Sequence, residues 1–156
     1  MRWQKIESEN DIQELLNECC GFHDYHLINL EFKSGIKRLP DLSIQSFVGD
    51  NPDCKLKLLF KTSDNTISIE LLFSGVRLFH FVGCQDHYDN EIVEAYMGVE
   101  GNLFKDNNQP FIVWSDNSDW ASETNIKEAI KNNNVFEEPS DSFVIANSLK
   151  WRIVDK

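Results

Sequence analysis

The chain has 156 residues, the size of one ordinary domain, so we treat residues 1–156 as a single globular domain. Apolar residues make up 41% of the chain and charged residues 26%, which argues against a disordered, collagenous or membrane-embedded protein. The formal net charge is −11, and this excess of acid argues against a surface that binds nucleic acid or anionic membrane.

The start of the chain and the cysteines indicate the compartment. The first ten residues, MRWQKIESEN, lack the apolar core of a secretion signal, and no apolar stretch is long enough for a spanning helix. Thiols stay reduced in the cytoplasm, and the cysteines include no C-x-x-C pair. The four cysteines are Cys19, Cys20, Cys54 and Cys84. We therefore expect a cytoplasmic protein with free thiols.

The first predicted element is a helix over residues 9–20. Its apolar residues repeat at helical spacing: Ile12, Leu15, Leu16, Cys19 and Cys20. Ser8 with Asp11, or Asn10 with Gln13, can cap its start, and Gly21 can end it. We expect both cysteines of this helix to be small core residues.

After the helix, apolar residues recur at every second position instead of every 3.6 residues, which predicts strands. In residues 26–32 the alternation puts His26, Ile28, Leu30 and Phe32 on one face. Residues 55–73 predict a hairpin with its turn at residues 62–65. Further strands are predicted over residues 76–82 (after Ser74-Gly75), 91–99, 110–114 and 142–154.

A second, short helix is predicted over residues 123–131, where Ile126, Ala129 and Ile130 form a stripe. The chain order is therefore a helix, a series of strands, a short helix and a last strand. This order predicts an α+β domain with a mostly antiparallel sheet of hairpins, one N-terminal helix and one short helix in the C-terminal half.

Two Cys-x-x-His pairs, Cys20/His23 and Cys84/His87, would together supply the four ligands that zinc prefers. However, Cys20 belongs to the apolar helix stripe, and His23 and His26 are spaced to lie on opposite faces of a strand. We therefore assign no metal site and no cofactor. We expect His23 and Asp24 to stabilise the helix-to-strand junction through hydrogen bonds from side chain to backbone.

No residue is assigned a catalytic role. In a strand, His80 would lie on the same face as Val76, Leu78 and Val82, which favours a hydrogen-bonded histidine within the sheet. The sequence contains no G-x-S-x-G, H-E-x-x-H or glycine-rich phosphate loop. The alternative, a small metal-dependent hydrolase or metal-binding protein, would use His23, Asp24, His26, His80 and His87.

The acidic charge is concentrated in residues 86–141, which contain 13 acids and three lysines. Such a segment either keeps the protein soluble or attracts a basic partner. We expect Trp114, at the end of an apolar run, to be a core residue, and Trp120 to be the exposed aromatic anchor. The acids of residues 86–141 do not have the D-x-D-x-D-G spacing of a calcium-binding loop. The candidate partner-binding residues are Asp86, Asp89, Glu91, Glu94, Asp116, Asp119 and Trp120.

A helix followed by Phe22-His23-Asp24, and then leucine-rich strands with Phe73-Ser74-Gly75-Val76, resembles small uncharacterised bacterial proteins that carry an FHD motif. Some of these proteins resemble immunity proteins of polymorphic toxin systems, which are single-domain, cytoplasmic and often acidic. The resemblance covers about residues 10–80 and implies a binding role without catalysis.

Together these patterns favour a non-enzymatic acidic protein that binds a basic protein partner, with a toxin-neutralising immunity protein as one form of that function. Two alternatives stay open. One is the metal-dependent hydrolase or metal-binding protein described above. The other is a structural module that self-associates through an open sheet edge.

Overall fold

The fold was analysed in a computed structural model that describes residues 2–41, 43, 51–64, 66–82, 91–104, 109–121, 126–127 and 141–155, with the backbone alone for residues 120, 121 and 155. The elements are, in order, β1 (Gln4–Lys5), α1 (Glu9–Glu18), η1 (Cys20–Phe22), β2 (Tyr25–Lys33), β3 (Lys55–Thr62), β4 (Ser68–His80), β5 (Glu91–Ile92), β6 (Tyr96–Glu100), β7 (Phe111–Ser115), η2 (Ser118–Ala121) and β8 (Phe143–Asp155).

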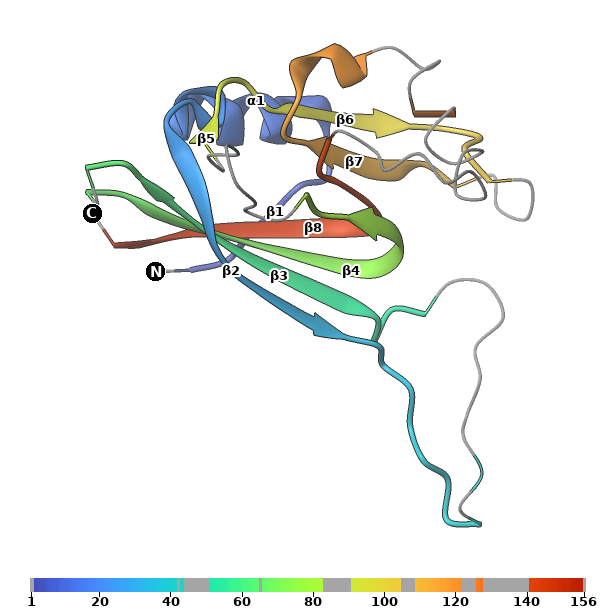
Figure 1. The fold of residues 1–156 in the computed structure, drawn as a ribbon. Helices are drawn as coiled ribbons and strands as arrows, with labels where there is room; N and C mark the ends of the chain where they lie inside the picture. Colours follow the sequence, from blue (N-terminus) through green and yellow to red (C-terminus); the bar gives the residue numbers. More distant parts are fainter. Residues whose placement is uncertain are drawn as a thin grey trace.

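The strands form one antiparallel sheet in the order β5-β2-β3-β4-β8-β7-β6, with β1 paired to β8. The sheet curls, so that β6 and β7 stand across from β3 and β4, and α1 lies beside them (Figure 1). This architecture confirms the predicted α+β class with a mostly antiparallel sheet. No helix in the described ranges is long and apolar enough to cross a membrane.

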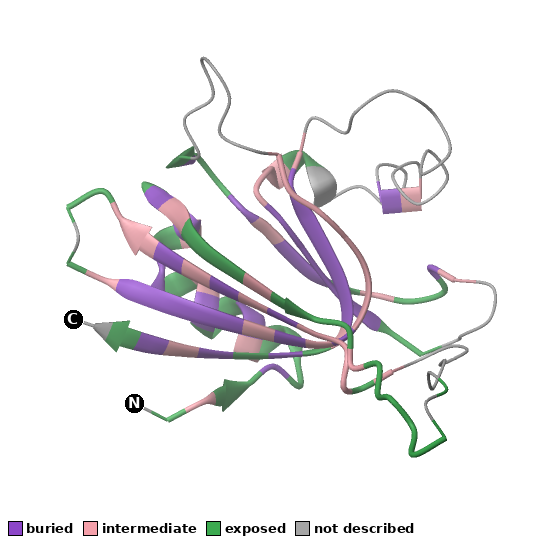
Figure 2. Cartoon of the chain, turned by 60° about the horizontal axis from the view of Figure 1, so that its bottom comes forward, coloured by how far each residue is buried: buried purple, intermediate pink, exposed green. Residues whose placement is uncertain are grey.

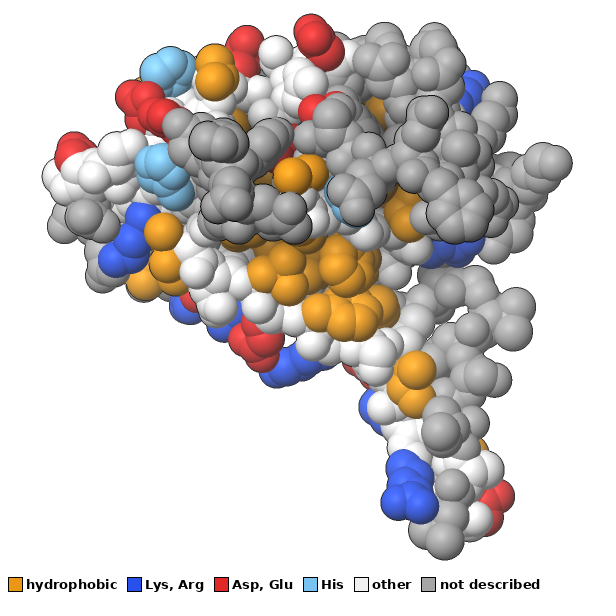
Figure 3. Space-filling model, viewed as in Figure 1, with side chains coloured by type: hydrophobic (Ala, Val, Ile, Leu, Met, Phe, Trp, Pro, Cys, Tyr) orange, Lys and Arg blue, Asp and Glu red, His pale blue; other side chains and the backbone are white. Residues whose placement is uncertain are grey.

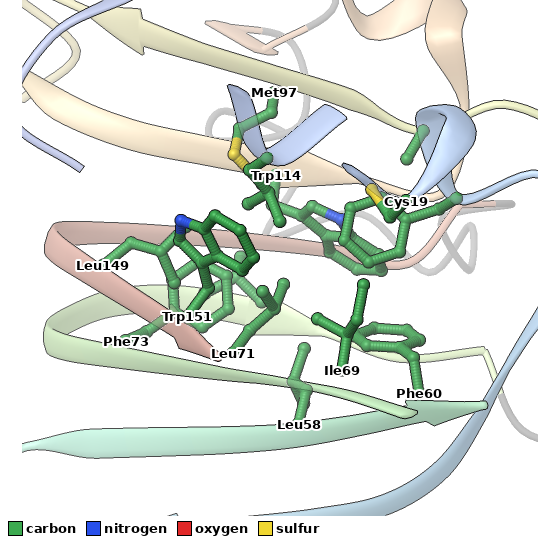
Figure 4. Packing of buried hydrophobic residues seen from close by; sticks show 14 of the residues in the cluster. Cys19, Leu58, Phe60, Ile69, Leu71, Phe73, Met97, Trp114, Leu149 and Trp151 are labelled. Carbon is green, nitrogen blue, oxygen red and sulfur yellow. The ribbon is translucent and has the colours of Figure 1, made fainter. Parts of the chain in front are cut away.

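The core fills the inside of this curl. Side chains from β3, β4 and β8 meet those of α1 and β6 around Trp114 and Trp151 (Figure 4). Cross-strand partners share a face, so the rows Leu58–Leu71–Trp151 and Leu56–Phe73–Leu149 run across the sheet on its inner side. All six side chains are buried, and buried residues continue along the strands in Figure 2. The predicted hairpin over residues 55–73 and the strands over residues 110–114 and 142–154 are confirmed.

The predicted helix is confirmed, but it ends earlier than expected. Ser8 caps it by accepting a hydrogen bond from the Asp11 backbone N–H, as predicted. The helix stops at Glu18, and Cys20 already has a φ of +48°, so its side chain leaves the apolar stripe. Cys19 is buried, which raises the pKa of its thiol to about 12. The prediction that Cys20 is a core residue is wrong, because Cys20 is exposed.

A bulge in β2 changes which side chains face the core. Leu27 pairs with Phe60 and Asn29 pairs with Leu59, so Ile28 is the extra residue. The single apolar face predicted for residues 26–32 is therefore wrong. Tyr25 and Leu27 lie on the inner side before the bulge, and Leu30 and Phe32 lie there after it.

Two other boundaries differ from the prediction. The expected break at Ser74-Gly75 is absent, because β4 continues through Gly75, whose φ is +65°. A side chain at Gly75 would collide with Asn147 of β8, so glycine lets the strand bend there without ending. The strand predicted over residues 91–99 is divided into β5 and β6. Of the helix predicted over residues 123–131, Ile126 and Lys127 are helical, and the rest lies outside the described residues.

Candidate functional site: an acidic pocket with an aromatic floor

A pocket of about 470 Å³ opens where β5 meets the end of β7 and the start of β8. Its residues fall into three chemical groups. The carboxylates are Glu91, Glu94, Asp116 and Asp141; the aromatic residues are Phe60, Phe81 and Trp114; the remaining lining consists of Leu27, Val82, Ile92, Val93, Asn117, Ser118 and Ser142. None of the described residues that line the pocket is a lysine or an arginine. The pocket therefore combines apolar surface with one sign of charge.

Asp116 is held in place by Ser142, the residue before β8, and no cation pairs with it among the described residues. Its backbone N–H donates to the Ser142 carbonyl oxygen at 3.1 Å, and the Ser142 N–H donates to Asp116 Oδ1 at 2.9 Å. The Ser142 hydroxyl accepts from the Val82 N–H at 3.1 Å, which ties the end of β4 to the same point. Burial raises the pKa of the Asp116 carboxyl, and the charge of Asp141 adds to this effect. The ionised form of Asp116 is therefore less well solvated than an ordinary surface aspartate.

Asn117 connects the other side of the pocket. Its side-chain amide donates to Asp141 Oδ1 at 3.1 Å, and its backbone forms a parallel bridge with Glu94. Asn117 Oδ1 also accepts the Asp119 backbone N–H at 2.9 Å, which fixes the start of η2. The side chain and backbone of Asn117 together therefore link the turn after β7 to residues before β6 and before β8.

The helix-to-strand junction places β5 at the rim of the pocket. The Asp24 N–H donates to the Ile92 carbonyl oxygen at 3.1 Å, and the Ala95 N–H donates to the Gly21 carbonyl oxygen at 2.9 Å. Cys20, Phe22 and Asp24 all have positive φ, which costs about 1–2 kcal/mol for each residue that has a side chain. The fold therefore accepts local strain in order to turn from α1 into β2 at this position.

His23 and Asp24 act at this junction in a different way from the one expected. Their side chains pair with each other, with His23 Nδ1 at 3.0 Å from Asp24 Oδ1, and both are exposed. The contacts across the junction are made by the Asp24 backbone, whose carbonyl oxygen also accepts from the Ser63 N–H and hydroxyl at 3.1 Å. Among the described residues, the bonds across the junction therefore use the Asp24 backbone, and none runs from the side chain of His23 or Asp24 to a backbone group.

The aromatic floor is a set of packed rings around Trp114. The Trp114 ring centroid lies 5.4 Å from that of Phe60 and 6.3 Å from those of Phe22 and Phe81. Trp114 is buried, as predicted for a core residue, and it also lines the pocket. Its indole N–H has no hydrogen-bond partner within the described structure. The aromatic floor is therefore closely packed and apolar, and its indole N–H is a donor without an acceptor among the described residues.

The structure brings together part of the predicted partner-binding set. Glu91, Glu94 and Asp116 line the pocket, whereas Asp119 is exposed on η2 outside it. Trp120 belongs to η2, but the prediction about its side chain lies outside the described residues, as do Asp86 and Asp89.

Sequence reasoning missed Asp141, Asn117, Ser142 and the aromatic floor. Asp141 was counted in the acidic segment, but nothing local to it indicated that it faces Asn117. The pairing of β7 with β8 brings these residues together, and that pairing joins segments about 30 residues apart in the chain.

The residues of the metal hypothesis do not converge. Within the described ranges, no three residues of the metal-binding types lie close enough to hold an ion. His26 Nε2 lies 3.0 Å from the Ser63 hydroxyl, and His80 packs against Phe143 with ring centroids 6.1 Å apart. Cys84 and His87 lie outside the described residues.

Three of the four acids that line the pocket can be compared with the paired acids Glu31 and Glu70 of the sheet. Among described residues, Glu91, Glu94 and Asp116 form no ion pair. Acidic side chains are visible on the upper part of the face in Figure 3, near β5 and α1. The negative potential of Glu91, Glu94 and Asp116 is therefore not cancelled by a neighbouring cation in the described structure.

No family model, curated protein or solved structure matches this chain. The function is therefore argued from the geometry and charge of the pocket.

Proposed function

We propose that this protein binds a basic protein partner by receiving a lysine or arginine side chain of that partner in the acidic pocket. The observation that carries the proposal is the Asp116 carboxylate, which is partly buried in a pocket that aromatic rings also line and has no cation beside it among the described residues. Burying an acid in this way disfavours its charged form unless a ligand supplies the opposite charge.

The two kinds of surface in the pocket suit the two parts of such a side chain. The aliphatic stem of lysine or arginine packs against apolar groups, and its charged end pairs with carboxylates. A guanidinium or ammonium group is also attracted to the face of an aromatic ring, with tryptophan the most favourable. Phe81, which is partly exposed, supplies the ring, and Glu94 and Asp116 supply the charge.

The class of partner follows from the charge and from the FHD resemblance. A protein of net charge −11 attracts a basic surface over long range, so association should slow as salt rises. The resemblance to immunity proteins favours a toxin with a basic site as this partner. The proposal is a binding function without catalysis. In it, the hydrogen bonds of Asp116, Asn117 and Ser142 fix the turn after β7 to the residues before β8 and so hold the pocket in shape.

The proposal is tested by titrating the protein with a short arginine-rich peptide and with the same peptide in which citrulline replaces every arginine. Citrulline keeps the shape of arginine but has no charge. We expect calorimetry to detect binding of the arginine peptide and at least a tenfold weaker response to the citrulline peptide, because charged hydrogen bonds contribute about 1.5–3 kcal/mol. Equal affinity for both peptides would overturn the proposal.

A matched pair of variants tests the location. Glu94→Gln removes a charge at the pocket, and Glu14→Gln removes the same charge at an exposed position of α1. We expect Glu94→Gln to weaken binding of the arginine peptide by about two- to fivefold, as for an exposed ion pair, and Glu14→Gln to leave it unchanged. Equal weakening in the two variants would show attraction to net charge rather than binding in the pocket.

A further inference from the structure

In the part of the chain that the structure describes, the C-terminal half of β2 is an open edge of the sheet. β5 pairs with β2 only at Tyr25 and His26, and no described strand pairs with residues 28–33 on the side away from β3 (Figure 1). Alternate backbone N–H and C=O groups of such an edge point outward and are ready to pair with another strand. The strand at the other end of the sheet, β6, is different because α1 and η2 contact it.

The side chains of this edge carry apolar surface that no described strand covers. Ile28, Leu30 and Phe32 are 55%, 37% and 44% exposed, which is high for large apolar side chains. Leu30 and Phe32 continue the inner rows of the sheet, because their β3 partners Leu58 and Leu56 are fully buried. Phe79 packs against Phe32 with ring centroids 5.0 Å apart, and hydrophobic side chains are gathered over the middle of this face in Figure 3. One more strand would extend these rows and bury their ends.

The charges at this edge are arranged for pairing with an identical strand. Glu31 and Lys33 flank Phe32 and point to the outer side of the sheet, where Glu31 already lies 3.1 Å from Lys33 and 3.0 Å from Lys57. If two β2 strands pair antiparallel about a twofold axis at Phe32, each Glu31 lies opposite Lys33 of the other copy. An axis at Glu31 or at Lys33 would instead place like charges opposite each other.

We infer that a second copy of this chain occupies the open edge of β2, pairing antiparallel with Phe32 at the twofold axis, so that two sheets join into one. This contact is isologous, because the same surface is used by both copies. The edge of β2 does not share the negative charge of the pocket, because Lys33, Lys55 and Lys57 lie near Glu31. The inference does not depend on the proposed binding of a basic partner, because the acids of the pocket take no part in it.

Charge exchange at the edge tests this inference. Sedimentation velocity over a wide range of concentration should show a species of twice the 18.1 kDa monomer mass. Glu31→Lys and Lys33→Glu should each weaken the dimer at least tenfold, because each places like charges across the axis. The double variant restores opposite charges and should dimerise like the unchanged protein. Glu14→Lys, at an exposed position of α1, is the control for a change of net charge.

Two further measurements keep the test decisive. Thermal unfolding of each variant shows that a loss of dimer is not a loss of fold. The disulfide test uses a Cys20→Ser background, which removes an exposed thiol. In this background, Phe32→Cys should form an intermolecular disulfide on oxidation more readily than Leu30→Cys. Only position 32 lies opposite the same position of the other copy. A protein that stays monomeric at all concentrations, or a double variant that does not recover the dimer, would overturn the inference.

Discussion

The acids on the outer face of the sheet and the acids of the pocket differ in how their charge is balanced. On the outer face, opposite the core, Glu70 is buried and accepts from Arg152 Nε at 2.6 Å, and Arg152 lies 4.5 Å above the Trp3 ring. Lys57 joins Glu70 to Glu31. In the pocket, by contrast, Glu91, Glu94 and Asp116 form no ion pair with any residue of the described ranges.

We interpret this difference as a separation between acids that stabilise the fold and acids that, in the proposed function, receive the cation of a partner. The same separation is visible in the pKa values of two aspartates. Hydrogen bonds from Thr62 and Thr66 lower the pKa of Asp64 to about 2, whereas burial raises the pKa of Asp116. Ionised Asp64 therefore stabilises the folded state, while ionised Asp116 destabilises it. A protein that retains a destabilising acid in a pocket is expected to use that acid for binding.

The largest effect is expected from a variant that breaks the ion pair between Glu70 and Arg152 on the outer face. Glu70→Ala should lower the free energy of unfolding by about 2–3 kcal/mol, because it removes a buried acid and leaves the guanidinium of Arg152 without its partner. Because Arg152 is partly exposed, the loss should be less than for a fully buried pair. Urea unfolding measures this difference. An effect no larger than that of Glu14→Gln would show that the network does not stabilise the fold.

A smaller effect, of opposite sign, is expected for the pocket acid. Asp116→Asn keeps an oxygen that can accept from the Ser142 N–H but removes the charge. Below the ordinary aspartate pKa of 3.8, Asp116 is protonated in both the folded and the unfolded protein, so its charge costs no stability. As the pH rises through the raised pKa of the folded state, the unchanged protein should lose stability relative to the variant.

Urea unfolding of both proteins between acidic and neutral pH tests this sign. We expect the free-energy difference to move in favour of Asp116→Asn as the pH rises. A difference that moves in favour of the unchanged protein would mean that the fold stabilises the Asp116 charge. The contrast between the outer face and the pocket would then be wrong.

Local sequence patterns were sufficient for most of the fold. The repeat of Ile12, Leu15 and Cys19 identified α1, and alternation in residues 55–73 identified the hairpin, because both patterns reflect contacts between near neighbours. The bulge at Ile28 and the bend at Gly75 escaped prediction, since each depends on the register with another strand. The departure of Cys20 from the helix stripe depends on the positive φ values of the junction.

The candidate site was less predictable than the fold. Glu91, Glu94 and Asp116 were identified as acids of one segment, but the sequence carries no sign of the rings that line the same pocket. Phe60 belongs to β3 and Trp114 to β7, and only the curl of the sheet brings them under the same pocket. Asp141 and Ser142 join the site through the pairing of β8 with β7.

The affinity of Asp116→Asn for the arginine-rich peptide tests the central claim most directly. The account predicts that, at neutral pH and low salt, this folded variant binds the peptide at least tenfold more weakly than the unchanged protein does. A variant that binds the peptide as tightly as the unchanged protein would contradict the claim that the carboxylate of Asp116 is held in the pocket to receive a cation.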